Sequence, residues 1–126
     1  MRLLADTHTV LWSLFDDQRL PASVRDNLND PANEVLVSVV SAWEFAIKRS
    51  LGKLNPPGEF EEGVRDSGFQ FLPLTPPHCR EYEKLPYITG HRDPFDRMLV
   101  VQAQWEGCHL VSIDETLDGY GVRRLW

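Results

Sequence analysis

The sequence has no long hydrophobic run and no leader-like N-terminus, and both shortages exclude classes of protein. No apolar stretch approaches the roughly 20 residues that cross a bilayer, so we expect no membrane association. Asp6 follows the first residue too soon for the apolar region of a signal peptide. We therefore expect a soluble protein that stays in the cytoplasm. Its 126 residues suit one domain over residues 1–126.

Cysteine pairs and positive charge are also scarce. Cys79 and Cys108 form no C-x-x-C pair, which argues against a structural zinc site. The formal net charge of −6 is unfavourable for general binding to phosphate backbones, although it suits a local acidic site that holds cations. The chain has no G-x-G-x-x-G, P-loop or nucleophile-elbow pattern, so no motif supports a nucleotide cofactor or serine-based hydrolysis.

The sequence does contain strand and helix patterns in regular alternation. The expected strands are 2–5, 34–38, 69–72, 109–113 and 122–125. The expected helices are 7–15, 21–28, 39–51, 60–66, 76–85 and 94–105, with loops at 55–58 and 87–93. This alternation predicts an α/β fold with a parallel sheet covered by helices on both faces. In such sheets, ligands bind outside the carboxyl ends of the strands.

Four acids are expected at that edge of the sheet. Asp6 follows the first strand directly, and Asp114 follows a later strand. Glu44 lies in the first two turns of the helix after the second strand, and Asp96 lies in the first turn of the helix that Pro94 opens. Strand ends and helix starts share one edge of an α/β sheet, so the four side chains can converge.

Each acid also has a purely structural interpretation. Asp6 suits the N-cap of its helix, and residues 41–44 match the capping box S-x-x-E. Asp93 before a proline is a good N-cap, with Asp96 favouring the positive end of the helix dipole. Asp114 suits the cap of a short turn. Taken singly, each of these interpretations is at least as strong as a functional one.

The joint pattern favours a metal site. Clustered carboxylates repel one another and raise each other's pKa unless a cation lies between them. Ligand sets made of oxygen suit Mg²⁺ or Mn²⁺ rather than zinc. Such ions activate water and stabilise the charge that develops on a phosphate oxygen, which is the chemistry of phosphodiester hydrolysis without a protein nucleophile.

These residues, in this order, resemble the PIN domain and, more closely, the VapC-type toxins of prokaryotic toxin–antitoxin pairs. The resemblance covers nearly the whole chain and is carried by residues 3–8, 41–44, 91–99 and 112–114. The run 93–99 is its most specific part. The resemblance implies a three-layer α/β/α sandwich and a Mg²⁺-dependent endoribonuclease, with Mn²⁺ as a substitute. It also implies a homodimer that a cognate antitoxin protein inhibits.

The resemblance also assigns roles to single residues. Asp6, Glu44 and Asp96 match the three most regular metal-site acids of the family. Asp114 matches the fourth, which varies more and acts through water in some members. Ser112 stands where the family often has threonine, so a hydrogen bond to a ligand or water is expected to be weaker or shifted there.

Neighbours of these acids are assigned less specific roles. Asp93 is expected to be an N-cap rather than a second contributor to the metal site. Arg97 is equally consistent with a phosphate contact, a carboxylate-orienting role and a surface ion pair. His8 and His91 have no partner histidine at metal-ligand spacing, so neither is favoured as a ligand.

Basic and aromatic residues raise two further expectations. Four basic residues are candidates for an RNA path beside the site, although an ordinary solvated role is favoured for each: Lys48, Arg49, Lys53 and Arg92. Most of the large apolar residues in the first and third helices should be core, and any that are exposed would mark a dimer or antitoxin surface: Trp12, Phe15, Trp43 and Phe45.

The sequence thus favours a metal-dependent endoribonuclease whose products carry a 5′-phosphate. A metal-dependent phosphatase or DNase would use the same acids. A non-catalytic PIN-like binding module, whose acids receive Arg or Lys from a partner, is an alternative from another class. A flavodoxin-like or response-regulator domain also has acids at strand ends, but the expected receiver aspartate and later lysine are not evident.

Overall fold

Five parallel strands form the centre of the protein, seen in a computed structural model that describes residues 1–54 and 58–126. The strands are β1 (Arg2–Ala5), β2 (Glu34–Ser38), β3 (Gln70–Leu72), β4 (His109–Val111) and β5 (Arg124–Leu125). They lie in the order β3-β2-β1-β4-β5, and every neighbouring pair is parallel. The prediction of an α/β fold with a central parallel sheet is therefore confirmed.

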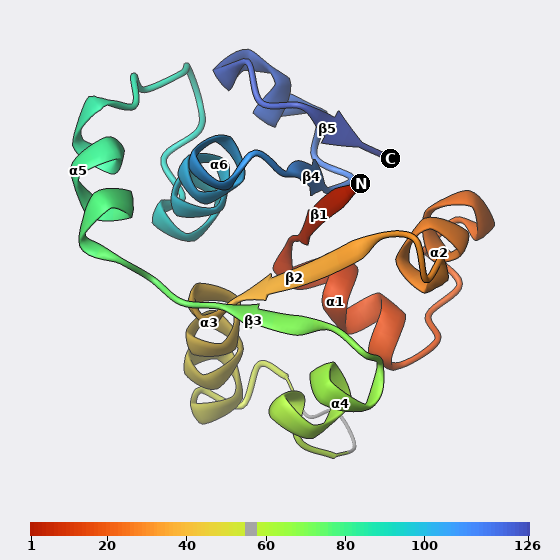
Figure 1. The fold of residues 1–126 in the computed structure, drawn as a ribbon. Helices are drawn as coiled ribbons and strands as arrows, with labels where there is room; N and C mark the ends of the chain where they lie inside the picture. The colour runs from red at the N-terminus through yellow and green to blue at the C-terminus, as the bar shows by residue number, and fades with distance from the viewer. Residues whose placement is uncertain (55–57) are drawn as a thin grey trace.

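Helices cover both faces of this sheet. They are α1 (Thr7–Leu14), α2 (Ala22–Asn29), α3 (Val39–Ser50), α4 (Phe60–Asp66), α5 (Pro76–Lys84) and α6 (Pro94–Glu106), with a 3₁₀ helix, η1 (Glu115–Tyr120). Figure 1 shows α1, α2 and α4 on one side of the sheet and α5 and α6 on the other. α3 contacts α1 and α4 on the first side and α6 on the second. In the described ranges, no helix combines the length and apolar composition needed to cross a bilayer.

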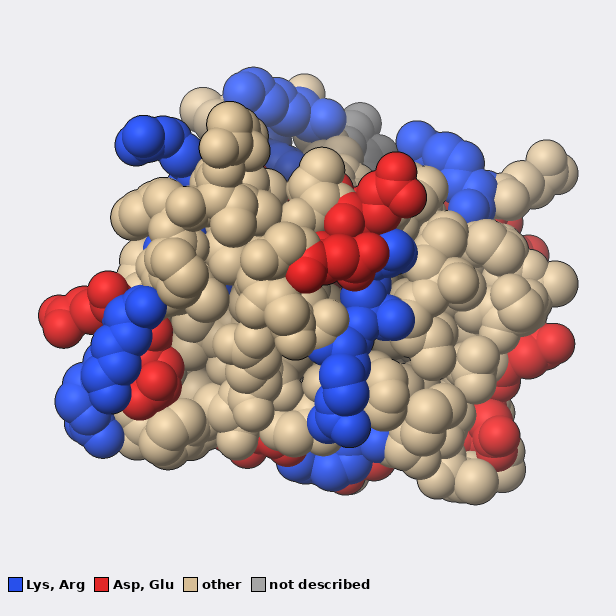
Figure 2. Space-filling model, turned by 90° about the horizontal axis from the view of Figure 1, so that it is seen from above, with Lys and Arg blue, Asp and Glu red and all other residues tan. Residues whose placement is uncertain are grey.

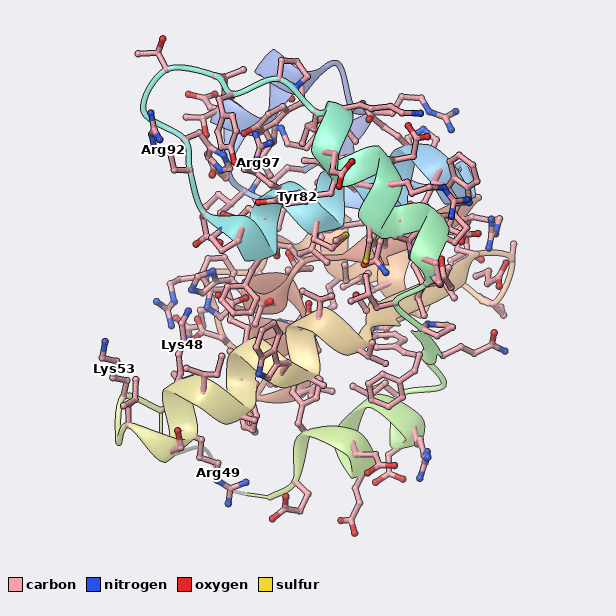
Figure 3. The ribbon with its side chains drawn as sticks, turned by 90° about the vertical axis from the view of Figure 1, so that its left-hand side faces the viewer. Lys48, Arg49, Lys53, Tyr82, Arg92 and Arg97 are labelled. Atoms are coloured by element: carbon pink, nitrogen blue, oxygen red, sulfur yellow. The ribbon has the colours of Figure 1, made fainter. Side chains whose placement is uncertain are left out.

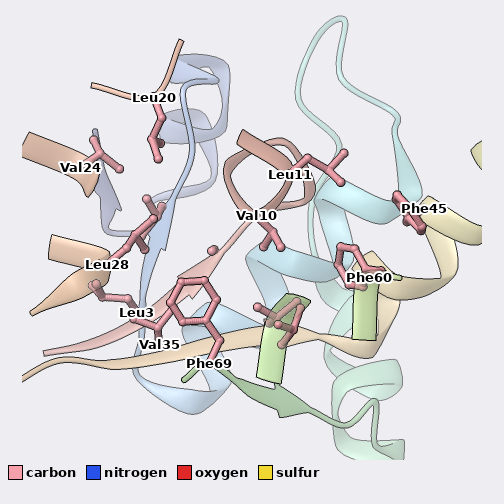
Figure 4. Packing of buried hydrophobic residues seen from close by; sticks show 14 residues of the cluster. Leu3, Val10, Leu11, Leu20, Val24, Leu28, Val35, Phe45, Phe60 and Phe69 are labelled. Atoms are coloured by element: carbon pink, nitrogen blue, oxygen red, sulfur yellow. The ribbon is translucent and has the colours of Figure 1, made fainter. Parts of the chain in front are cut away.

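Alternating side chains of β1 divide the core into two layers. Leu3 and Ala5 face one cluster, where they pack with Val10 of α1 (Figure 4). Leu4 faces the other cluster, where it packs with Leu99 of α6. This alternation follows from the two-residue period of a strand. Full burial of one such leucine contributes about 2 kcal/mol, so the layers fix the strand register and hence the position of each strand end.

The central strands end level with one another. Ala5 pairs with Val37 of β2 and with Val111 of β4, so the chain leaves all three strands at one edge. Side-chain caps start three helices at this same edge. Asp6 caps α1, Ser38 caps α3 and Asp93 caps α6.

Several predicted boundaries differ from those in the structure. The strand predicted at 109–113 ends at Val111, because the Ser112 hydroxyl accepts a hydrogen bond from the backbone N–H of Asp114 and turns the chain. The strand predicted at 122–125 contains only Arg124–Leu125. Of the loop predicted at 55–58, residues 55–57 lie outside the described residues.

Candidate active site

Asp6 is held at the end of β1 by a cap and a strand contact. Its backbone N–H donates to Val111 O at 3.1 Å, and its Oδ1 accepts from the backbone N–H of Thr9 at 2.8 Å. The residue is buried. The predicted N-cap role is therefore real, but it uses one carboxylate oxygen and leaves Oδ2 for another partner. Capping and metal binding are compatible at this position.

Glu44 is buried in α3 and held by two side chains. The Thr7 hydroxyl donates to Oε1 at 2.6 Å, and Lys48 Nζ lies 3.1 Å from Oε2. The capping-box interpretation of Glu44 is wrong, because α3 begins at Val39 with Ser38 as its cap, whereas Ser41 lies inside the helix. The Ser41 hydroxyl lies 3.0 Å from that of Thr7, and it is the donor of this pair because the single Thr7 proton goes to Glu44. No pattern in the sequence links Thr7 to Glu44, since only the packing of α1 against α3 brings the two together.

Asp96 lies in the first turn of α6, three residues after its N-cap, Asp93. The Asp93 carboxylate accepts from the backbone N–H groups of Phe95 and Asp96 at 2.8 and 3.2 Å, so Asp93 is the N-cap as expected. Burial, followed by nearby negative charges, raises the pKa of Asp96 from 3.8 to about 7. Those charges belong to Asp93, Asp6, Glu44 and Asp114. The charges of Asp6, Glu44 and Asp114 thus act on Asp96, but among the described residues the ligand atoms that lie within 4.8 Å of one another belong to His91, Asp96 and Asp114 and include neither Asp6 nor Glu44.

Asp114 follows β4 and starts η1. Its Oδ1 accepts from the backbone N–H of Thr116 at 3.0 Å and from the Thr116 hydroxyl at 2.6 Å. The Ser112 side chain is fully buried, and its hydroxyl accepts from the Asp114 backbone N–H at 3.1 Å. Ser112 therefore positions Asp114 through the main chain.

His91 lies beside the acids, although the sequence pattern did not favour it as a ligand. Its Nε2 is 3.6 Å from Asp96 Oδ2, and one ligand atom from each of His91, Asp96 and Asp114 lies within 4.8 Å of the others. The loop is held by a bridge between Ile88 and His91. On the other side of the ring, Nδ1 lies 2.7 Å from the hydroxyl of Tyr120. The spacing of histidines in the sequence gave no signal for this contact, which depends on loop closure.

Arg97 is buried, so one of the roles expected for it is wrong. It does not form a surface ion pair, because only 1% of the residue is exposed. Its guanidinium stacks 3.6 Å from the centre of the Tyr87 ring and donates to the carbonyls of Pro86 and Leu85. Enclosed in this way, it does not present N–H groups to a phosphate arriving from solvent. Its link to the acids runs through Tyr120, whose hydroxyl accepts from Nη1 at 3.2 Å.

Basic side chains lie beside the acidic edge. In Figure 3, Lys48, Lys53 and Arg92 lie along the side of the molecule on which the first turn of α6 also lies. Arg49 points away from them and pairs with Glu59 at 3.3 Å. From above, acidic and basic groups are interspersed over a largely uncharged face, which does not form a continuous positive patch (Figure 2).

The donors at this edge fit a divalent cation. They are carboxylate oxygens, the ligands that Mg²⁺ and Mn²⁺ prefer. Burial and the neighbouring carboxylates raise the pKa of Asp96, and a cation bound there would offset this negative charge. Among these acids, Asp96 and Asp114 each offer a carboxylate oxygen within 4.8 Å of the other. The acidic cluster thus has the composition and charge of a metal site.

Comparison with known proteins identifies the family. The family model of the PIN domain matches residues 3–122, nearly the whole chain. The chain belongs to the PIN domain family. A solved structure of VapBC2 from Rickettsia felis, bound to a DNA fragment from their promoter, matches this PIN domain with a TM-score of 0.69 at 16% sequence identity. The match covers 95% of this chain and 93% of the other, and at that identity it shows the shared fold. No curated protein matches the chain.

Proposed function

We propose that this PIN domain is a Mg²⁺-dependent endoribonuclease and the toxin of a toxin–antitoxin pair. The observation that carries the proposal is the state of Asp96. Burial and four neighbouring acids raise its pKa to about 7, at the carboxyl edge of the sheet of a PIN domain. Such an unfavourable accumulation of charge is expected at a functional site and is offset by a bound cation.

The acids are proposed to bind the ion as ligands. Asp6, Glu44 and Asp96 are proposed as its ligands, and Asp114 as a fourth that binds directly or through water. Thr7 orients Glu44 through its hydroxyl, and the Asp93 cap fixes the first turn of α6 that carries Asp96. When bound, Mg²⁺ lowers the pKa of a water molecule and offsets the charge that develops on the scissile phosphate.

Nearby cations are proposed to guide the RNA. Lys48 pairs with Glu44 at 3.1 Å, so its ammonium lies at the border of the site. Arg92, exposed and within 5.6 Å of the centre of the Tyr87 ring, follows His91 in the loop before α6. Phosphate contacts of this kind contribute affinity that falls as salt rises, without selecting a sequence.

A cleavage assay tests the proposal. Purified protein is incubated with single-stranded and structured RNA, with DNA and with a small phosphate ester, in Mg²⁺, Mn²⁺ or EDTA. We expect cleavage of RNA that requires metal and is lost in Asp6→Asn. The matched control is Asp66→Asn at the exposed end of α4, which should cut as the wild type does. Preferential hydrolysis of DNA or the ester would favour the other metal-dependent activities, and metal-independent partner binding without any cleavage would favour a binding module.

The partner proposal has two supports. The structure from Rickettsia felis is of a VapBC2 pair. In this chain, Trp43 is 62% exposed and borders an apolar groove of about 290 Å³. The groove is lined by Val40, Trp43, Leu74, Tyr82, Pro94, Phe95 and Met98. Exposed apolar surface of this kind is typical of a binding face, either for a second copy in a homodimer or for an antitoxin segment.

Two binding measurements on one variant separate these occupants. Mass measurement by light scattering on wild type and Trp43→Glu asks whether the groove joins two copies. Capture of the coexpressed antitoxin by the same variant asks whether it receives the antitoxin. If Trp43→Glu keeps both the mass of the wild type and its capture of the antitoxin, the groove is not a partner surface.

A further inference from the structure

A chain of buried polar contacts connects Arg97 to the acidic site. It runs from the guanidinium of Arg97 to the hydroxyl of Tyr120, then to the imidazole of His91, and ends facing Asp96. Arg97, Tyr120 and His91 are all buried. Buried polar groups are costly unless they are hydrogen-bonded, so the direction of each hydrogen bond in this chain is constrained.

Arg97 fixes the first direction. An arginine side chain donates hydrogen bonds and accepts none. Its Nη1 donates to Pro86 O at 3.0 Å and to the Tyr120 oxygen at 3.2 Å, while Nη2 donates to Leu85 O at 2.9 Å. The Tyr120 oxygen is therefore an acceptor toward Arg97, and its own proton must go elsewhere.

Tyr120 then fixes the imidazole. Among the described side chains, the acceptor in reach of its hydroxyl proton is His91 Nδ1, at 2.7 Å. A nitrogen that accepts a hydrogen bond carries no proton, so the proton of the neutral ring must lie on Nε2. That nitrogen is buried and has no hydrogen-bond partner within the described ranges, and it faces Asp96 Oδ2 at 3.6 Å.

We propose that His91 is a positioning residue for the metal-site carboxylate of Asp96, and that Tyr120 and Arg97 fix it as the Nε2–H tautomer. The proposal rests on the proposed function in so far as Asp96 is a metal ligand. A protonated Nε2 has no lone pair to give a cation, so His91 orients Asp96 instead of binding the ion. The 3.6 Å separation is longer than a hydrogen bond, and contacts of this type often tighten only when a site is filled.

The competing arrangement makes a distinct prediction. With its proton on Nδ1, His91 would direct a lone pair from Nε2 toward the acids and join Asp96 and Asp114 as a metal ligand. The buried Tyr120 hydroxyl would then lose its described acceptor. The two arrangements differ in which ring nitrogen carries the proton, and that can be measured without any metal.

The first experiment is ¹⁵N NMR of the imidazoles in the metal-free protein, at a pH where the rings are neutral. We expect the proton of His91 on Nε2 in the wild type, and a mixture of tautomers in Tyr120→Phe, which removes the donor to Nδ1. Tyr82→Phe is the matched control, because its hydroxyl also lies beside Arg97, at 3.4 Å, but does not contact His91. A wild-type proton on Nδ1, or an unchanged tautomer in Tyr120→Phe, overturns the proposal.

The second experiment is calorimetric titration with Mg²⁺. Side chains that orient a metal ligand are worth roughly 10- to 100-fold in metal affinity, so Tyr120→Phe and His91→Leu should bind Mg²⁺ at least about 10-fold more weakly. His91→Gln keeps an N–H donor and should retain most of the affinity, which separates positioning from a loss of folding. Equal weakening in His91→Gln and His91→Leu would contradict the donor role.

The outcomes also separate this proposal from the function on which it rests. Mn²⁺ bound to the wild type should show no ¹⁴N coupling in its EPR spectrum, and such a coupling would make His91 a ligand and refute its positioning role. If the wild type binds Mg²⁺ and Tyr120→Phe binds it equally, the proposal for His91 fails while the metal site stands. If the wild type binds no Mg²⁺, both fail, whichever tautomer is found.

Discussion

Replacing Asp96 by asparagine should stabilise the metal-free protein above neutral pH. The substitution keeps the shape of the side chain and removes its charge from among the other acids. A rise in pKa from 3.8 to about 7 corresponds to at most about 4 kcal/mol, at 1.36 kcal/mol per unit. Since 31% of the side chain is exposed, solvent screening reduces the effect. The favourable interaction of Asp96 with the start of α6 subtracts up to about 1 kcal/mol more. We expect a net gain of about 1–2 kcal/mol.

The gain should depend on pH in a defined direction. In the folded protein the Asp96 carboxyl keeps its proton up to about pH 7, whereas in the unfolded chain it loses the proton near pH 4. The folded state thus binds more protons between these values, and wild-type stability falls as pH rises through this window. The difference between Asp96→Asn and wild type should be small near pH 4, grow up to about pH 7, and stay constant above it.

Urea unfolding in EDTA at several pH values measures this difference. Asp66→Asn serves as the control for loss of an exposed carboxylate and should follow the wild type. For a chain of this size, 1 kcal/mol corresponds to a shift of about 4 °C in Tm, so a thermal scan is also sensitive enough. An Asp96→Asn protein that is no more stable than wild type at pH 8 would refute the reasoning about charge at this site.

Four further predictions concern the same framework. In Mg²⁺ at 100 times its Kd, wild type should gain about 2.7 kcal/mol in the free energy of unfolding, and Asp6→Asn should gain much less; equal gains would contradict the ligand assignment. Asp93→Ala should lose about 1 kcal/mol in urea unfolding through the lost cap of α6, and a neutral result would mean that the cap is dispensable. Arg97→Lys should lose about 3 kcal/mol, because an ammonium cannot replace the planar, multiply bonded guanidinium, and a loss under 1 kcal/mol would contradict this. Val37→Ala, in the core beside β1, should lose about 2 kcal/mol by the same assay, and an unchanged midpoint would contradict the packing described.

Much of the fold could be predicted because its signals are local. Strand β2 and helix α4 have the predicted bounds, since turn residues and periodicity mark both ends. Asp93 and Pro94 define the start of α6, and Gly107 ends it with a positive φ of 69°, a conformation that favours glycine. The level of the strand ends then follows from the parallel sheet, which is why the acids could be placed at one edge.

The polar groups that surround the acids could not be predicted in this way. Thr7 meets Glu44 only because α1 packs on α3, and His91 meets Tyr120 across 29 positions of the chain. Arginine is usually exposed, yet three tyrosines and two backbone carbonyls enclose the side chain of Arg97. Such contacts depend on tertiary packing, for which a single sequence carries no periodic signal.

The sequence also could not predict which aromatic residues are exposed. Trp43 and Phe45 are two positions apart on α3, but Phe45 is buried beside Phe60 while Trp43 is exposed and meets Phe95 edge-on. Their helical spacing puts them on different faces. The face of α3 that is buried depends on its contacts with α1 and α4 on one side and α6 on the other.

The chemistry of the cut ends tests the central claim most directly. RNA cleaved in Mg²⁺ is analysed for its termini, with parallel samples in EDTA. Attack by water on the phosphate, with the 3′-oxygen leaving, predicts products with 5′-phosphate and 3′-hydroxyl ends, and no cleavage in EDTA. Products with 2′,3′-cyclic phosphate and 5′-hydroxyl ends, formed equally in EDTA, would show attack by the ribose 2′-hydroxyl and contradict a metal-dependent site at these acids.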